Sequence, residues 1–470
     1  MKKMLMALSL SGALLGGSAV VWAEEAASTP ATEQTVAVSD TVAETVTTVV
    51  AETTAPAEAA PAPEETPTVD TGDTAWILVS TALVLLMTIP GLALFYGGMV
   101  RKKNVLSTMM FSLSAAILVS LIWVIVGYSL AFSGSGAYVG DLAKAMLNGV
   151  AFDALSGTIP ESLFVIFQMT FAIITVAIIS GSIADRMKYS AFMAFIAVWV
   201  ILVYAPITHW VWAADGWLFK AGALDFAGGT VVHINAGVAG LVAAYMLGKR
   251  TGLGRESMAP HNLTLTVIGA SLIWVGWFGF NGGSALGAGA RASMAILVTQ
   301  VAAAAAAFSW LLVERLIRGK ASVLGGASGA VAGLVVITPA AGFVGVGGAL
   351  IMGLIGGVVC FWGITALKRL LKADDALDAF GLHAVGGIVG AVLTGIFYSD
   401  EIIKAAGVVL APTFAGQLWV QIEGVLATIV YSGVVTFIIL KVIDLVIGIR
   451  VSADDERMGL DLSQHGERIE

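Results

Sequence analysis

The stretch HINAGVAG, His233 to Gly240, decides the fold, because it places a titratable imidazole inside a long apolar run. A second stretch, HAVGGIVG from His383 to Gly390, repeats the order of a histidine, a small residue, a glycine and a β-branched residue in the second half of the chain. Ionisable side chains within membrane segments are rare, and they commonly mark a transport path or a hydrogen bond between helices. The two histidines are therefore the first candidate functional residues.

The composition around these stretches is typical of a protein that crosses a membrane many times. Of 470 residues, 58% are hydrophobic and 12% are charged, and the mean hydropathy is +0.92, far from the values of soluble domains. The 55 glycines predict closely packed membrane helices. We expect no nucleic acid partner, no metal and no cofactor. The single Cys360 excludes an intrachain disulfide and a cysteine-based metal site.

The N-terminal region divides into two segments. Residues 1–23, MKKMLMALSLSGALLGGSAVVWA, have a basic start, an apolar stretch and small residues before a cleavage point after Ala23. This pattern predicts a signal peptide, and an uncleaved anchor helix is the alternative. Residues 24–72 are rich in Ala, Thr, Glu, Val and Pro, which predicts a disordered periplasmic linker. Residues 73–448 then form the transmembrane domain.

Hydrophobic runs of about 20 residues, the length of a membrane-spanning helix, recur through residues 73–448. They predict an all-α polytopic membrane protein with 11 transmembrane helices. The predicted spans are 75–99, 105–132, 162–184, 190–212, 229–248, 263–281, 293–316, 324–340, 344–367, 379–398 and 418–447.

The basic residues predict the orientation of these spans. If the mature N-terminus lies outside, most of the 24 Lys and Arg residues fall in the inner loops, for example RKK at Arg101 to Lys103. Such a bias is typical of cytoplasmic loops. We therefore expect an outer N-terminus, a cytoplasmic C-terminus and a cytoplasmic regulatory tail over residues 449–470.

The two histidines fall on the fifth and tenth predicted spans, which have opposite orientations. This placement predicts a five-plus-five inverted repeat with a substrate site near the middle of the membrane. Each half also has an acidic residue before its histidine, Asp225 in LDFAGGTVVH and Asp378 in LDAFGLH. The spacings differ, so this comparison indicates only a weak internal repeat.

Several longer stretches carry a resemblance to a known family. DFAGGTVVHINAGVAGLVAAYMLGKR, beginning at Asp225, closely resembles the signature of the ammonium transporter family, the Amt/Mep/Rh proteins. MTIPGLALFYGGMVRKKNVLS, GWFGFNGGSA, GLHAVGGIVGAVLTGIF and GLDLSQHGE are also similar to Amt members. The resemblance covers about residues 73 to 470, and it favours the Amt branch in bacteria.

The resemblance implies a homotrimer in which each subunit has its own narrow apolar pore. It assigns His233 and His383 as the twin histidines of that pore. It also implies ammonium or ammonia as substrate, nitrogen uptake as the role and the bacterial inner membrane as the location. The tail is a candidate docking surface for a PII-type nitrogen regulatory protein, although it could equally be a solvated end that contacts the neighbouring subunit.

The resemblance further implies an outer site that recruits ammonium through Phe171, Trp212 and Ser284. Phe171 and Phe280 resemble the stacked aromatic pair that closes the pore mouth. Without the resemblance, Trp212 would be an interfacial anchor and the phenylalanines would be packing residues. Asp225 could hold the outer cation directly or cap the fifth helix, and we favour the structural role.

The expected chemistry follows from the cost of moving a bare ion into hydrocarbon, on the order of tens of kcal/mol. Aromatic rings and one hydroxyl can select ammonium at the mouth, but only neutral ammonia crosses an apolar pore cheaply. Two neutral imidazoles can line the path and relay a proton. The sequence leaves net ammonium transport and a passive ammonia gas channel open. An ammonium-sensing membrane receptor is a further alternative, and we expect no enzymatic activity.

Overall fold

The structure is a computed structural model that describes residues 68–469. The predicted signal peptide and nearly all of the predicted linker lie outside the described residues. The first helix, α2 (Thr71–Leu86), begins just before the predicted start of the transmembrane domain, and the carboxylate of Asp70 caps it by accepting the N–H of Asp73 at 2.8 Å. Apart from two short paired strands, the regular structure of residues 68–469 is helical.

Several long helices of the first half contain one turn of π-helix, which divides them into labelled parts. The elements up to α10 are α2, η1 (Met87–Leu92), α3 (Ala93–Met99), η2 (Lys102–Asn104), α4 (Val105–Ile122), η3 (Trp123–Gly127), α5 (Tyr128–Phe132), η4 (Ala145–Leu147), β1 (Leu155–Ser156), β2 (Ile159–Pro160), α6 (Glu161–Ile183), α7 (Tyr189–Trp199), η5 (Val200–Tyr204), α8 (Ala205–Trp212), α9 (Trp217–Lys220), η6 (Gly229–Ile234) and α10 (Asn235–Leu247).

The second half also contains π-helical turns next to its α-helices, and it ends in two short helices. Its elements are α11 (Leu263–Gly283), α12 (Ala290–Arg318), α13 (Val323–Ile337), α14 (Val346–Trp362), η7 (Gly363–Leu367), α15 (Lys368–Leu371), η8 (Phe380–Ala384), α16 (Val385–Phe397), α17 (Asp400–Ala405), α18 (Phe414–Val446), α19 (Ala453–Met458) and α20 (Leu460–His465).

Within residues 68–469, ten helices are long and apolar enough to cross a membrane. The remaining predicted span, 324–340, corresponds to α13, which has only 15 residues. At 1.5 Å per residue such a helix is about 22 Å long, shorter than the hydrocarbon core of a bilayer. The protein is therefore a multi-pass membrane protein, and the count of eleven crossings stays a prediction.

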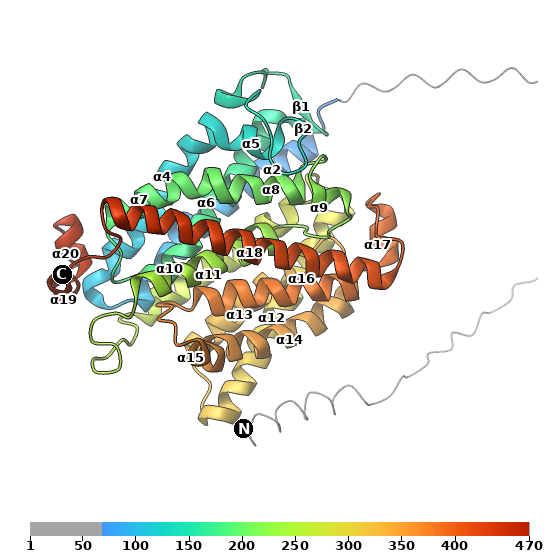
Figure 1. Cartoon of the computed structure of the whole chain (residues 1–470). Coiled ribbons are helices and arrows are strands. Elements are labelled where there is room, and N and C mark those ends of the chain that lie inside the picture. The colour runs from blue at the N-terminus through green and yellow to red at the C-terminus, as the bar shows by residue number, and fades with distance from the viewer. Residues whose placement is uncertain (1–67, 470) are drawn as a thin grey trace, which may run out of the picture. The chain divides into compact units, whose positions relative to one another are not determined.

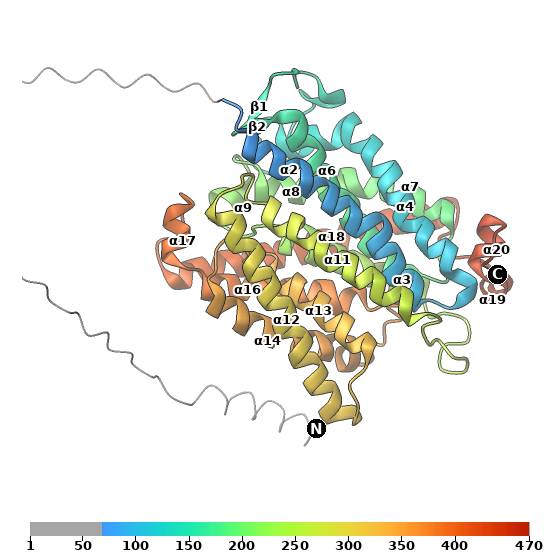
Figure 2. The ribbon, with the colours of Figure 1, turned by 180° about the vertical axis from the view of Figure 1, so that it is seen from behind.

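The helices pack around two central segments, α6 and η6–α10. α18 runs in front of α10 and α16 and packs against both (Figure 1). Seen from behind, α2, α11 and α12 lie side by side (Figure 2). The most apolar windows of α6 and of η6–α10 are each 78% buried, the largest values among the spans. These two segments therefore form the centre of the bundle. At Gly237 of α10 a side chain would collide with Ala384, so glycine lets the η8 turn approach α10 closely.

The tail docks on the end of the bundle that the sequence predicts to be cytoplasmic. Asp461 accepts the N–H of Ser107 at 2.7 Å, and Asn104 accepts the N–H of Leu460 at 2.8 Å. The buried carboxylate of Glu456 accepts hydrogen bonds from Thr251 and from Arg450. Burial raises the pKa of Glu456, but these hydrogen bonds outweigh it, so its pKa lies below the ordinary value of 4.5. The last residues are thus fixed to the transmembrane domain rather than solvated along their length.

Candidate functional site

The two predicted pore histidines meet in the centre of the bundle. His233 lies in η6 and His383 in η8, and their Nδ1 atoms are 3.2 Å apart. The rings are stacked, with centroids 5.3 Å apart and an angle of 26° between their planes. Both side chains are buried, and His233 also stacks on Trp277 at 5.4 Å. At this distance one neutral ring donates the hydrogen bond and the other accepts it, which fixes complementary tautomers.

The carboxylate of Asp225 sets the position of His233. It accepts the N–H groups of Gly228 and Gly229 through Oδ1, at 2.9 and 2.6 Å. Through Oδ2 it accepts those of Thr230 and Val231, at 2.8 and 3.1 Å. The first N–H groups of a helix have no partner within the helix, so this single side chain satisfies the start of η6. Both carboxylate oxygens of Asp225 are therefore engaged by backbone N–H groups at the start of η6.

Gly228 allows this arrangement, because the chain enters η6 in a left-handed conformation. Its φ is 110°, a value that residues with a side chain rarely adopt. A Cβ at this position would also lie too close to Val232. The glycine therefore lets the backbone turn so that four N–H groups point at one carboxylate.

In the second half, Asp375 has the role that the sequence analysis gave to Asp378. Its two oxygens accept the N–H groups of Ala379 and Phe380, at 3.2 and 2.8 Å, just before and at the start of η8. Asp378 instead forms a salt bridge with Lys368 at 2.6 Å. The pairing of Asp225 with Asp378 was therefore wrong. Asp225 and Asp375 each precede a histidine by eight residues, and this equal spacing was the signal available in the sequence.

A small cavity of about 10 Å³ lies beside the histidines. Volumes of this size hold about one water-sized molecule. Its walls are apolar apart from the two imidazoles. Nε2 of His233 is buried and has no hydrogen-bond partner among residues 68–469. The remaining lining residues are Met87, Leu92, Phe95, Ile174, Ile178, Ile273, Trp277, Phe280 and Val331.

A much larger pocket, of about 680 Å³, lies on the other side of two aromatic rings. Its walls include Phe171, Trp212, Asp225 and Ser284, so the structure brings the three predicted recruitment residues together. Trp212 donates from Nε1 to the backbone oxygen of Asp225 at 2.8 Å, and its ring is perpendicular to that of Phe171 with centroids 5.6 Å apart. Ser284 donates to the backbone oxygen of Phe280 at 2.8 Å, which leaves its hydroxyl lone pairs free.

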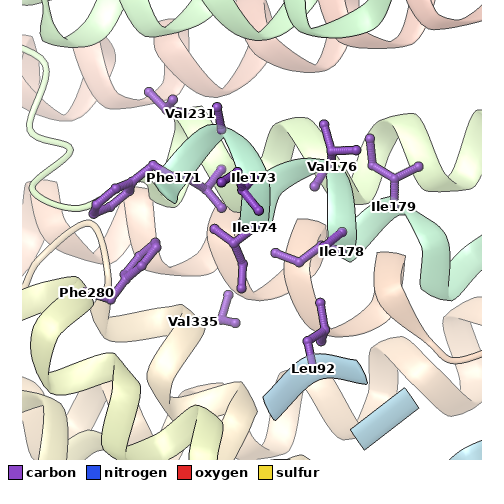
Figure 3. Close-up of a cluster of buried hydrophobic side chains, with 14 of the residues drawn as sticks. Leu92, Phe171, Ile173, Ile174, Val176, Ile178, Ile179, Val231, Phe280 and Val335 are labelled. Carbon is purple, nitrogen blue, oxygen red and sulfur yellow. The ribbon is translucent and has the colours of Figure 1, made fainter. Parts of the chain in front are cut away.

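The rings of Phe171 and Phe280 separate the pocket from the cavity. They are stacked, with centroids 4.3 Å apart and 25° between their planes, and they face each other in Figure 3. Phe171 lines the pocket and Phe280 lines the cavity. The close-up also shows Ile174 and Ile178 of α6 in the same cluster of buried apolar side chains (Figure 3).

The other histidines lie away from this site. His209 is buried and bonds to the backbone oxygens of Ala131 and Gly136, at 2.9 and 2.5 Å. His261 bonds to the backbone oxygen of Val100, and His465 packs edge-on against Tyr189. None of the three lines the pocket or the cavity. The sequence analysis missed Trp277. Its Nε1 donates a hydrogen bond to the hydroxyl of Thr338 at 2.9 Å, and its indole ring stacks against the ring of His233.

The fold and site together define a polytopic helical membrane protein in which a wide pocket, an aromatic barrier and a buried histidine pair follow one another. Among the described residues, no group of three or more His, Cys, Asp or Glu side chains could hold a metal ion. The sequence as a whole matches the model of the Ammonium Transporter Family over residues 75–469.

Individual relatives agree with that match. The ammonium transporter of Bacillus subtilis is 52% identical over 399 residues, which is 84% of this chain and 98% of the relative. The crystal structure of Candida albicans Mep2 is similar with a TM-score of 0.77 and 37% identity, over 85% of this chain and 90% of Mep2. A structure titled Sensor Amt Protein has a TM-score of 0.78 and 30% identity, over 84% of this chain and 98% of that one. The chain therefore belongs to the ammonium transporter family.

Proposed function

We propose that the protein takes up ammonium by binding the ion in the outer pocket and separating it into ammonia and a proton. Ammonia passes the two histidines, and the proton is relayed inward along the same histidine pair, so that one net charge crosses with each ammonium ion. The observation that carries the proposal is the buried, unpartnered Nε2 of His233, whose side chain lines an apolar cavity large enough for one water-sized molecule. A hydrated or bare cation is excluded from such a cavity by its desolvation cost, whereas neutral ammonia can enter and hydrogen-bond to an imidazole.

The pocket supplies the selective step of the proposal. Phe171 and Trp212 offer two ring faces to a cation, each contributing about 0.5–2 kcal/mol, and Ser284 offers a hydroxyl acceptor. Na⁺ and K⁺ bind there too but have no proton to lose. Rejection of these ions follows because only ammonium has a neutral form that can pass the Phe171 and Phe280 rings when they move apart.

Family membership and the contacts of the tail support a proposal for the oligomeric state, the membrane and a regulatory partner. We propose a homotrimer in the bacterial inner membrane, with the N-terminus outside and each subunit carrying its own pore. The docked helices α19 and α20 then offer a cytoplasmic surface to a PII-type nitrogen regulatory protein. The five-plus-five repeat is supported by the shared motif of an acid eight residues before a histidine in a π-helical turn.

The test is a current measurement on purified protein in liposomes. An ammonium pulse should give a saturable transient current, a potassium pulse should give none, and His233→Ala should lose the ammonium current while remaining folded. His261→Ala is the matched control, because that histidine lies outside the cavity. A pH change inside the vesicles without a current would show that the protein conducts neutral ammonia alone and does not transport net ammonium. Normal current in His233→Ala would contradict the histidine route.

A second candidate function is an ammonium sensor, which is favoured by the similarity to the structure titled Sensor Amt Protein. A sensor would bind ammonium saturably and change the state of a partner with negligible flux. The same liposome experiment separates the two functions, because a transporter must accumulate charge or substrate inside the vesicle.

A further inference from the structure

Gln168 is a buried polar side chain in the outer pocket that the proposed function has not used. It lies on α6, one turn before Phe171 and one turn after Phe164, and all three line the pocket. Residues three and four apart share one face of a helix, so this face of α6 presents an amide between two aromatic rings.

The amide of Gln168 has no partner. Only 8% of the residue is exposed, its Oε1 has no hydrogen-bond partner, and the side chain makes no hydrogen bond with any other part of residues 68–469. A buried amide oxygen that stays unsatisfied destabilises the fold by the loss of its hydration, so such a group is retained when something outside the chain satisfies it.

The surroundings of the pocket decide what that ligand is. Its two basic residues are already engaged, since Lys220 pairs with Asp215 at 2.7 Å and the guanidinium of Arg291 lies over Phe226 and Phe343. The ring faces of Phe171 and Trp212 are left for a cation, and an amide oxygen is an acceptor for N–H groups. The last torsion of a glutamine is roughly twofold, so the amide oxygen and nitrogen can exchange places, and one of these two orientations turns the oxygen toward the pocket.

We propose that Gln168 is a further substrate-binding residue, whose amide oxygen accepts an N–H group of the ammonium ion in the outer pocket. This inference rests on the proposed function. With Ser284 it gives the ion two hydrogen-bond acceptors in addition to the aromatic faces. Ammonium, with four N–H donors, gains from both acceptors, whereas K⁺ has no directional donor to match them.

The test is the half-saturation concentration for ammonium current, measured for Gln168→Met, Gln168→Glu and the parent protein. Methionine keeps the length and burial but removes the acceptor, so half-saturation should rise about tenfold while the maximal current stays within twofold. Glutamate keeps an acceptor at this position and adds a negative charge, so it should lower half-saturation below the parent value. Gln300→Met is the matched control, because Gln300 accepts from Trp274 and does not line the pocket.

The outcomes separate this proposal from the proposed function. A parent protein with saturable current and a Gln168→Met variant with unchanged half-saturation would overturn only the role of Gln168. If the parent carries no ammonium flux, the proposed function fails, and the dissociation constant of ammonium chloride measured by calorimetry then tests Gln168 directly by the same tenfold rise. If Gln168→Met does not fold, Gln168→Glu decides, since a half-saturation no lower than that of the parent contradicts the proposal.

Discussion

Asp225 and Asp375 have equivalent positions in the two halves of the chain. Each lies eight residues before a buried histidine, and each carboxylate accepts backbone N–H groups at the start of the π-helical turn that carries that histidine. The two histidines meet because two distant turns are anchored in the same way. Since an unsatisfied helix start is costly, these aspartates control the geometry of the site without touching either imidazole.

The first prediction concerns the choice between Asp375 and Asp378. Asp375→Ala should lower the free energy of unfolding by about 2–3 kcal/mol, because it leaves buried N–H groups and the hydroxyl of Ser182 without an acceptor. Asp378→Ala should cost less than about 1 kcal/mol, because its salt bridge with Lys368 is partly exposed. Thermal denaturation of the two variants in detergent checks the order, and a larger loss for Asp378→Ala would contradict the anchoring role of Asp375.

The second prediction separates the two roles considered for Asp225. Replacement by asparagine turns one accepting oxygen into a donor that faces N–H groups, so Asp225→Asn should destabilise the protein by about 2–4 kcal/mol as well as reduce flux. Stability and ammonium half-saturation are measured on the same preparation. A variant as stable as the parent but with weakened ammonium binding would mean that the carboxylate holds the cation directly.

The third prediction concerns Trp212. Trp212→Leu should raise the half-saturation concentration for ammonium by about 2- to 30-fold, which corresponds to the loss of one cation–π contact. Trp212→Phe keeps an aromatic face but loses the hydrogen bond to Asp225, so its half-saturation should lie between those of the parent and Trp212→Leu. Equal effects of the two substitutions would show that the hydrogen bond, and not the ring, matters. Trp419→Leu on the exposed side of α18 is the control.

The fourth prediction concerns pH and the docking of the tail. The pKa of Glu456 is lowered in the folded protein, so its contribution to stability is present above the unfolded value near 4.5 and is lost as the pH falls through the folded value. Glu456→Gln should therefore reduce the thermal midpoint at pH 7, by an amount equivalent to about 1–2 kcal/mol, and the difference from the parent should shrink as the pH falls below the ordinary value of 4.5. A difference that stays constant from pH 7 to 3.5 would show that the charge of Glu456 does not hold the tail.

Much of the architecture was predictable from local patterns. Apolar run length placed the membrane helices because a bilayer fixes the length of a spanning segment. The predicted span 324–340 corresponds to α13, which is too short to cross by itself. Hydrophobic periodicity did not predict the π-helical turns at His233 and His383.

The candidate site was predicted residue by residue only where a motif named it. His233 and His383 were singled out by their place in apolar runs, and Phe171, Trp212, Ser284 and Phe280 were named from the resemblance. The structure brings these six residues to one pocket and one cavity. Gln168 and Trp277 were not singled out, because an amide or an indole in an apolar helix has no pattern of its own. Only the packing around Gln168 reveals that its amide lacks a partner.

The sequence by itself determined that the chain is a multi-pass membrane protein of this family and that two histidines lie within apolar segments. Composition and run length decide the membrane class because transfer into a bilayer depends on each segment alone, and the quoted motifs decide the family. The tertiary structure decided which acid anchors each histidine, how the aromatic rings divide the pocket from the cavity, and which buried polar atoms remain without a partner. Those properties depend on distances between segments that the order of residues does not contain.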